Sequence, residues 1–164
     1  MATIKSILFM EEDDSDYMQQ CLKLARLALA AGDPPVGVVI VHEGEIIGTG
    51  IESGKSTGDI TNHAEILAVR DAIKNGHVDK LGLATMYTTH EPCIMCSYVL
   101  RHHHIPKIVY GTSVPFIGGS SSRFNILSTK DVPKWGDGPE IISGVCLDEC
   151  IQLNEDFKKV LANS

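Results

Sequence analysis

The sequence predicts an α/β protein, a three-layer α-β-α sandwich around a mixed five-stranded sheet. Five short runs rich in β-branched residues alternate with segments whose apolar residues recur every three or four positions. The first two runs are joined by a short hairpin turn, whereas later runs are joined by helix-length segments, as parallel strands require. Because no repeat or second core interrupts the 164 residues, we expect one domain over residues 1–164.

The expected elements alternate along the chain. Helical spacing predicts a first helix over residues 17–31, which Gly32 ends. Strands over 36–41 and 46–51 flank a hairpin turn at 42–45. The remaining elements are a loop at 52–61, a helix from 64 to about 75, a strand at 84–89, a helix at about 93–103, a strand at 107–111, an irregular segment at 114–138 with a short helical piece near 124–127, a strand at 140–143 and a helix from 147 to 161.

The first fifteen residues differ from the rest of the chain. A short apolar run has little basic charge and lacks the small residues of a cleavage site, and an acidic run over 11–16 follows it. We expect residues 1–15 to form a loosely attached leader, the acidic run to cap the first helix, and the protein to be cytoplasmic. No apolar run approaches the roughly 20 residues of a membrane span, so no membrane association is expected.

The charge balance bears on the partner. The chain has 14 basic and 21 acidic residues, a net charge of −7. An acidic chain is repelled by phosphate backbones, so the composition disfavours a nucleic-acid partner. It does not exclude one, because charges can gather in patches.

Two motifs, His-x-Glu and Pro-Cys-x-x-Cys, lie about thirty residues apart and carry the chemistry. Zinc prefers nitrogen and thiolate ligands in a tetrahedron, and catalytic sites use three protein ligands and keep the fourth position open. His63, Cys93 and Cys96 supply three such ligands. Glu65 is then left as an acid–base group that would take a proton from zinc-activated water and deliver it to the ring nitrogen and the departing amine.

Helical structure would bring the two motifs into position. Cys93 and Cys96 would share one helix face, and Pro92 suits a first helical turn. Thr61 and Asn62 are good N-cap types for the helix that follows His63. Two helix N-termini would then face one metal, and their positive ends would favour thiolate and hydroxide.

Two other interpretations of the cysteine pair are weaker. A redox pair needs no upstream His-x-Glu motif, and a closed structural zinc site needs a fourth ligand, for which His90 is the only near candidate. The remaining cysteines, Cys21, Cys146 and Cys150, are expected to pack in the interior, and a second metal half-site at the last two is disfavoured. Histidines 102–104 are expected at the surface or an interface, and Trp135 is expected to anchor the long loop rather than to form a lid.

With both motifs in place, the sequence resembles the cytidine deaminase-like zinc deaminase superfamily. The nearest branch holds tRNA-specific adenosine deaminases, guanine deaminases and cytosine deaminases. The resemblance spans about residues 16–159 and rests on four blocks: Pro35-Val36-Gly37, His63-Ala64-Glu65-Ile66, Tyr87-x-Thr89-x-Glu91-Pro92-Cys93-x-Met95-Cys96 and Asp148-Glu149-Cys150. It implies one zinc ion per subunit held by His63, Cys93 and Cys96, a proton shuttle at Glu65, and a homodimer. It also implies a substrate pocket to which Ala64, Pro92 and Asn62 contribute.

Two departures from that family concern the substrate. Glu52 stands where the family often has a substrate-gripping asparagine, and a carboxylate only accepts hydrogen bonds. The family's tRNA enzymes carry basic residues after the fourth strand, whereas residues 112–119 here are apolar or neutral, with Phe116 as a candidate stacking residue. Glu52 therefore suggests a ligand that offers N–H or O–H groups, unless it is simply a surface loop residue. The second departure, together with the net negative charge, favours a small nucleobase or nucleoside over a nucleic acid.

The sequence therefore predicts a zinc-dependent hydrolytic deaminase that converts an exocyclic amino group of a nucleobase, nucleoside or related heterocycle to a carbonyl and releases ammonia. The first alternative is a tRNA-specific adenosine-to-inosine deaminase. The second is a zinc-stabilised interaction protein without turnover, which the intact Glu65 argues against.

Overall fold

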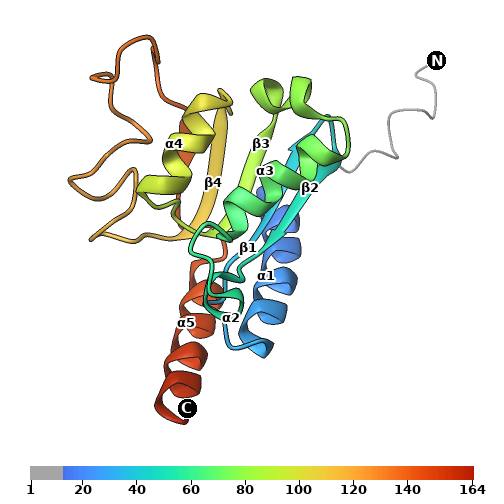
Figure 1. Ribbon diagram of the computed structural model, residues 1–164, viewed down its shortest axis with the longest axis vertical. Helices are drawn as coiled ribbons and strands as arrows, with labels where there is room; N and C mark the ends of the chain where they lie inside the picture. Colours follow the sequence, from blue (N-terminus) through green and yellow to red (C-terminus); the bar gives the residue numbers. More distant parts are fainter. Residues whose placement is uncertain (1–12) are drawn as a thin grey trace, which may run out of the picture.

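The computed structural model describes residues 13–164, which form three layers around a central sheet (Figure 1). The sheet has the strand order β2-β1-β3-β4-β5. Its strands are β1 (Gly37–His42), β2 (Glu45–Ile51), β3 (Thr85–His90), β4 (Lys107–Thr112) and β5 (Glu140–Ile142). Pairs β1–β2 and β1–β3 are antiparallel and pairs β3–β4 and β4–β5 are parallel, which confirms the expected mixed sheet.

Helices cover both faces of the sheet. Helix α1 (Asp14–Ala30) and helix α5 (Leu147–Ala162) contact one another and pack on one face. Helix α3 (Ala64–Lys74) and helix α4 (Ile94–His102) cover the other face. This is the three-layer sandwich expected from the sequence.

The alternation of side chains along β1 explains the layers. Val38 and Ile40 belong to the cluster that includes buried residues of α3 and α4. Val39 and Val41 belong to the opposite cluster, with residues of α1. Successive strand residues point to opposite faces, so a continuous apolar run is what a strand buried on both faces requires.

Glycines let the sheet and α3 approach closely. A Cβ atom at Gly50 of β2 would overlap the backbone carbonyl of Ala64, the first residue of α3. A Cβ atom at Gly48 would lie 2.9 Å from the Cβ of Ala72. The close contact fixes the start of α3 at the end of β2, where the candidate site lies.

The acidic run caps α1, as the sequence predicts. Asp13 is the N-cap, and Asp13 and Asp16 form a reciprocal capping box with each other's backbone N–H groups, at 3.0 Å each. The helix begins at Asp14, so residues 14 and 15 belong to α1, Asp13 caps it, and none of the three belongs to a loosely attached leader. The rest of that leader, residues 1–12, lies outside the described residues.

Two local expectations were wrong, and a 3-10 helix, η2 (Val78–Leu83), precedes β3 where no element was expected. A short helix, α2 (Gly54–Thr57), interrupts the expected loop at 52–61. The expected helical piece near 124–127 is a turn. Other element ends differ from the expected ends by one to three residues. None of the helices in the described part of the chain has both the length and the apolar character needed to cross a bilayer.

The long segment between β4 and β5 extends beside α4 (orange in Figure 1). Its Trp135 stacks over the guanidinium of Arg101 at 4.9 Å and lies 5.4 Å from the ring of Tyr98. The expected role of Trp135 as a packing anchor is therefore confirmed. His102 and His104 are exposed, which agrees with the expected surface position of the histidine run.

Candidate active site

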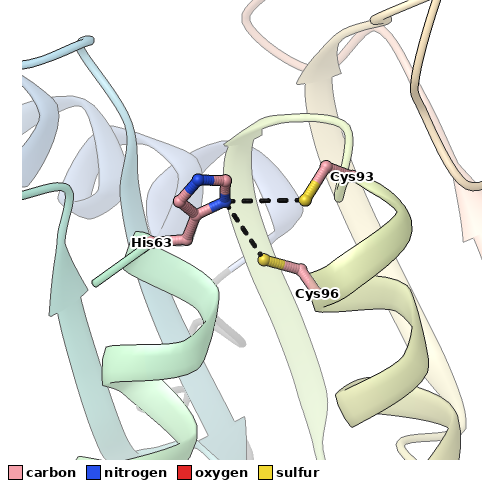
Figure 2. Close-up of side chains that lie close together, drawn as sticks. All are labelled: His63, Cys93 and Cys96. Carbon is pink, nitrogen blue, oxygen red and sulfur yellow. Dashed lines mark hydrogen bonds between the residues drawn. The ribbon is translucent and has the colours of Figure 1, made fainter. Parts of the chain in front are cut away.

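The N-termini of α3 and α4 bring the two sequence motifs together. His63 is the N-cap of α3 and Cys93 is the N-cap of α4, and Cys96 lies in the first turn of α4. Figure 2 shows the imidazole pointing toward both sulfur atoms. His63 Nδ1 lies 3.5 Å from Cys93 Sγ and 3.5 Å from Cys96 Sγ.

These three side chains fit a zinc ion. Their ligand atoms all lie within 4.8 Å of one another. In a tetrahedron with Zn–S near 2.3 Å and Zn–N near 2.05 Å, nitrogen and sulfur ligands stand about 3.5 Å apart. The two measured N–S separations match that value, so the donors are already spaced for the metal.

The protonation states of the three donors are linked. Hydrogen bonds from Cys96 and His63 lower the pKa of Cys93 to about 4, which makes it a thiolate. The neighbouring Cys93 in turn raises the pKa of His63 to about 9. The pKa of Cys96 is raised because its thiol donates to Cys93 and is buried. A divalent cation at this site would displace the protons of His63 and Cys96.

Glu65 lies beside the three donors. It is the second residue of α3, only 4% exposed, and its Oε2 accepts a hydrogen bond from Cys96 Sγ at 3.4 Å. Burial, and then the negative charge of Cys93, raise the pKa of Glu65 to about 7. A carboxyl group with this pKa can both accept and donate a proton near neutral pH.

Glu52 caps α3 from a distance. Its Oε2 accepts a hydrogen bond from the backbone N–H of Ala64 at 3.1 Å, and its Oε1 accepts one from Gly54 at 3.1 Å. Burial raises the pKa of Glu52, which is 6% exposed. The expected N-caps Thr61 and Asn62 were wrong, because His63 occupies the cap position and Glu52 supplies the acceptor.

A pocket of about 400 Å³ opens next to His63. Its walls come from the loop before β1, the end of β2, the α2 region and the start of α3. The lining residues are Pro34, Glu52, Gly54, Lys55, Gly58, Ile60 and His63. The pocket therefore joins a proposed substrate contact, Glu52, to a candidate zinc ligand.

The other residues expected at the substrate lie outside this lining. The Asn62 amide donates to Thr57 Oγ1 at 3.0 Å, and Ala64 contributes its backbone N–H to Glu52. Pro92 is buried, and its carbonyl accepts from Gly119 at 2.8 Å. Phe116 is 77% exposed on the loop after β4.

Sequence reasoning missed several residues of this region. Lys55 and Ile60 line the pocket from a segment that reads as a polar loop. Asp33 is fully buried, and its Oδ1 accepts from the Ser56 backbone N–H at 2.7 Å, which holds α2 in place. An aspartate followed by two prolines signals only a turn, so this contact could not be predicted from the sequence.

The alternative metal sites find no support in the geometry. His90 Nε2 lies 2.7 Å from Asn154 Oδ1, and its Nδ1 lies 3.1 Å from Thr89 Oγ1, so its ring is engaged elsewhere. Within residues 13–164, the group formed by His63 and the two cysteines includes no fourth histidine, cysteine or carboxylate. Cys146 and Cys150 form no second group of this kind among those residues.

Comparison with known proteins agrees with this geometry. The model of the cytidine and deoxycytidylate deaminase zinc-binding region matches residues 11–112, more than half of the chain. The tRNA-specific adenosine deaminase of Haemophilus influenzae is 39% identical over 150 residues, which cover 90% of this chain and 85% of the relative. The tRNA-specific adenosine deaminase of Aquifex aeolicus is 36% identical over 151 residues, which cover 90% and 95%.

Solved structures share the fold. One, from a study of A-to-I editing by tRNA:A34 deaminases at the wobble position, matches with a TM-score of 0.75 and 28% identity over 84% of this chain and 97% of that chain. Guanine deaminase from Bacillus subtilis matches with a TM-score of 0.58 and 30% identity over 62% and 66%. The chain therefore belongs to the cytidine and deoxycytidylate deaminase family of zinc-binding proteins and is a hydrolytic deaminase of the nucleobase and nucleoside class.

Proposed function

We propose that His63, Cys93 and Cys96 hold one zinc ion per subunit and that Glu65 carries the proton in the deamination of a small amino-heterocycle, a free base or a nucleoside. The observation that carries the catalytic part is the spacing of the three donors with a buried carboxyl group beside them. Bound zinc supplies a Lewis acid that lowers the pKa of water in its open position from about 15.7 to about 7.

Glu65 performs the proton transfers. It takes one proton from the attacking water and gives it to the ring nitrogen, and it then takes the remaining proton from the new hydroxyl group on the ring carbon and gives it to the departing amine. The water oxygen bonds to the ring carbon, the C–N bond breaks, and ammonia leaves with the bonding electrons while a carbonyl forms. Burial of Glu65 at 4% exposure keeps bulk water from competing for the proton.

The carboxylate of Glu52 is evidence for a small substrate that offers N–H or O–H groups. Each of its oxygens accepts one backbone N–H bond and keeps a second lone pair. Glu52 also lines the pocket that reaches His63. A guanine-type edge or a sugar hydroxyl would donate to this carboxylate, whereas a group that only accepts would be repelled.

Charge supports the same choice. The chain carries a net charge of −7, and residues 112–119, at the end of β4 and on the loop after it, contain no lysine or arginine. The affinity of a protein for an RNA backbone depends on contacts between cationic side chains and phosphates. We therefore place a nucleic acid second among the substrates.

The second candidate substrate is the adenosine of a tRNA. The specific observation in its favour is that relatives named tRNA-specific adenosine deaminase are 36–39% identical over nearly their whole length. Exposed aromatic residues such as Phe116 could stack on unpaired bases of an RNA loop.

Ammonia release separates the two candidates. The zinc-loaded protein is incubated with guanine, guanosine, adenine, adenosine, cytosine, cytidine, aminotriazines and an adenosine-bearing anticodon stem-loop, with Glu65→Gln as the matched control. We expect ammonia from at least one free base or nucleoside and none from the control. Release from the stem-loop alone would assign the tRNA function instead.

We also propose one domain, a homodimer and a cytoplasmic location. The continuous sheet and its two helical layers support a single domain. The thiolate ligands support a reducing compartment. Sedimentation equilibrium of the zinc-loaded protein tests the dimer, and a single species with the mass of one chain would contradict it.

A further inference from the structure

The side chain of Glu91 accepts hydrogen bonds from both ends of the loop formed by residues 114–121, the first part of the segment that follows β4. Its Oε2 accepts from the Val114 N–H at 2.7 Å and from the Ser121 hydroxyl at 2.5 Å. Its Oε1 accepts from the N–H groups of Ser120 at 2.8 Å and Ser121 at 2.5 Å. Glu91 is 2% exposed, so four donors from one loop satisfy a buried carboxylate that forms no ion pair with any cation of residues 13–164.

The same loop rests on the segment that carries Cys93. The Gly119 N–H donates to the Pro92 carbonyl at 2.8 Å, and Cys93 and Gly118 form an isolated antiparallel bridge. The Glu91 N–H donates to the Thr112 carbonyl at 2.9 Å. Backbone contacts therefore place the loop against the start of α4, and the Glu91 side chain holds the loop in that position.

The space around the carboxylate is closed. A Cβ atom at Gly118 would overlap the Cδ and both oxygens of Glu91. The loop and the carboxylate are thus packed without room for a methyl group. If a different side chain at residue 91 binds the loop less well, the loop must shift. Because the loop lies against Cys93, that shift would also disturb Cys93.

We propose that Glu91 is a positioning residue: by fixing residues 114–121 against Pro92 and Cys93, it holds the Cys93 sulfur where zinc binding requires it. This proposal rests on the proposed role of Cys93 as a zinc ligand and goes beyond it, because Glu91 is not one of the three donors. It does not depend on which heterocycle is the substrate.

Glu91→Gln is the direct test, because it keeps the shape and replaces one acceptor oxygen with an NH₂ group. That NH₂ group would face an N–H donor on whichever side it lies, at Val114 or at Ser120 and Ser121. We expect the loop to loosen there. We expect zinc affinity to fall about tenfold, in the range seen when groups that orient metal ligands are changed.

The experiment has two readouts that need no substrate. Zinc affinity is measured by competition with a chromophoric chelator at neutral pH, and amide hydrogen exchange is followed at Val114, Ser120 and Ser121. Glu140→Gln is the matched control, since it removes the same charge at an exposed position on β5. The proposal predicts faster exchange and weaker zinc binding in Glu91→Gln, and wild-type behaviour in the control.

A merely structural tether would give a different result. Faster exchange with wild-type zinc affinity would overturn the proposal, and so would wild-type values of both. If Glu91→Gln does not fold, Glu91→Asp decides by the same criteria, because it keeps the charge but is too short to reach both ends of the loop. Because zinc affinity is read without turnover, failure of the substrate assignment would leave this result intact.

Discussion

The two regions beside the candidate active site, the starts of helices α3 and α4 and the long segment between β4 and β5, are held in place in different ways. The donors and Glu65 lie at the starts of α3 and α4, two regular helices that pack on the sheet, and Glu52 accepts from the first N–H group of α3. The long segment between β4 and β5 has little regular structure, and two buried side chains add hydrogen bonds to those that its backbone makes in turns. Glu91 accepts from its N–H groups, and Arg101 donates to its carbonyls at Ile126, Leu127, Thr129 and Gly136.

The two regions suit different tasks: the starts of the helices place the metal ligands and the proton carrier, and the loop carries Phe116, the candidate residue for stacking on the substrate. Metal and proton transfer need atoms placed to within a fraction of an ångström, which regular elements provide. Substrate choice can vary with a loop, provided that something rigid holds the loop. A carboxylate and a guanidinium, both anchored next to or on α4, hold it here.

The largest effect is expected on the chemical side. Glu65→Gln removes the proton carrier but leaves the three donors, so turnover should fall by about 10² to 10⁴-fold. Zinc content should stay at one per chain, since Glu65 is not among the three donors. Ammonia release and elemental analysis check this, and a fully active variant would remove Glu65 from its assigned role.

The next largest effect is expected on stability, in the segment between β4 and β5 that Arg101 holds. Arg101→Met would leave four carbonyls of the loop without their buried donor, and the free energy of unfolding should fall by about 4 kcal/mol. Urea unfolding measures it. Lys130→Met is the control, because its ion pair with Asp137 is exposed and its loss should leave the midpoint unchanged. Equal effects of the two variants would contradict the comparison.

The burial of Glu65 predicts a pH dependence of stability. Its pKa is raised from 4.5 to about 7, so its stabilising contribution is fully present below about pH 4.5 and is lost as pH rises through 7. Relative to Glu65→Gln, the zinc-free wild type should lose up to about 3 kcal/mol across that window. Urea unfolding at a series of pH values tests this, and a constant difference between the two proteins would speak against the raised pKa.

The smallest effect is expected at Phe116, which lies in a turn shortly after β4. Phe116 is 77% exposed, so Phe116→Ala should leave stability unchanged. If Phe116 stacks on the substrate, KM should rise about fivefold, which corresponds to about 1 kcal/mol. Phe124→Ala on the same loop is the comparison variant. An unchanged KM in Phe116→Ala would make Phe116 a surface residue and confine recognition to the Glu52 side.

The zinc-donor triad could be predicted from the sequence because two short motifs with specific residue types and spacing identify its members, although His63 and the cysteines come from different helices. Cys93 and Cys96 are set by one helical turn, and the layers follow from alternation along single strands such as β1. Glu65 also follows from its place two residues after His63.

What the sequence could not reveal depends on contacts between distant segments. Glu52 caps α3 twelve residues away, which requires the path of α2 to be known. The sequence places Glu91 in a motif, but its role could not be predicted, because the N–H groups that bind it lie 23 to 30 residues later on a loop. N-cap preferences favoured Thr61 and Asn62, yet the cap position went to His63, whose side chain is turned toward the two cysteines.

The central claim is that three side chains of this chain hold zinc and leave one position open. X-ray absorption at the zinc edge tests it most directly. The account predicts two sulfur ligands at about 2.3 Å, one histidine nitrogen at about 2.0–2.1 Å and one further light-atom ligand that an added inhibitor or substrate exchanges. A zinc ion with four ligands from the protein, or a purified protein that binds no zinc, would contradict the account.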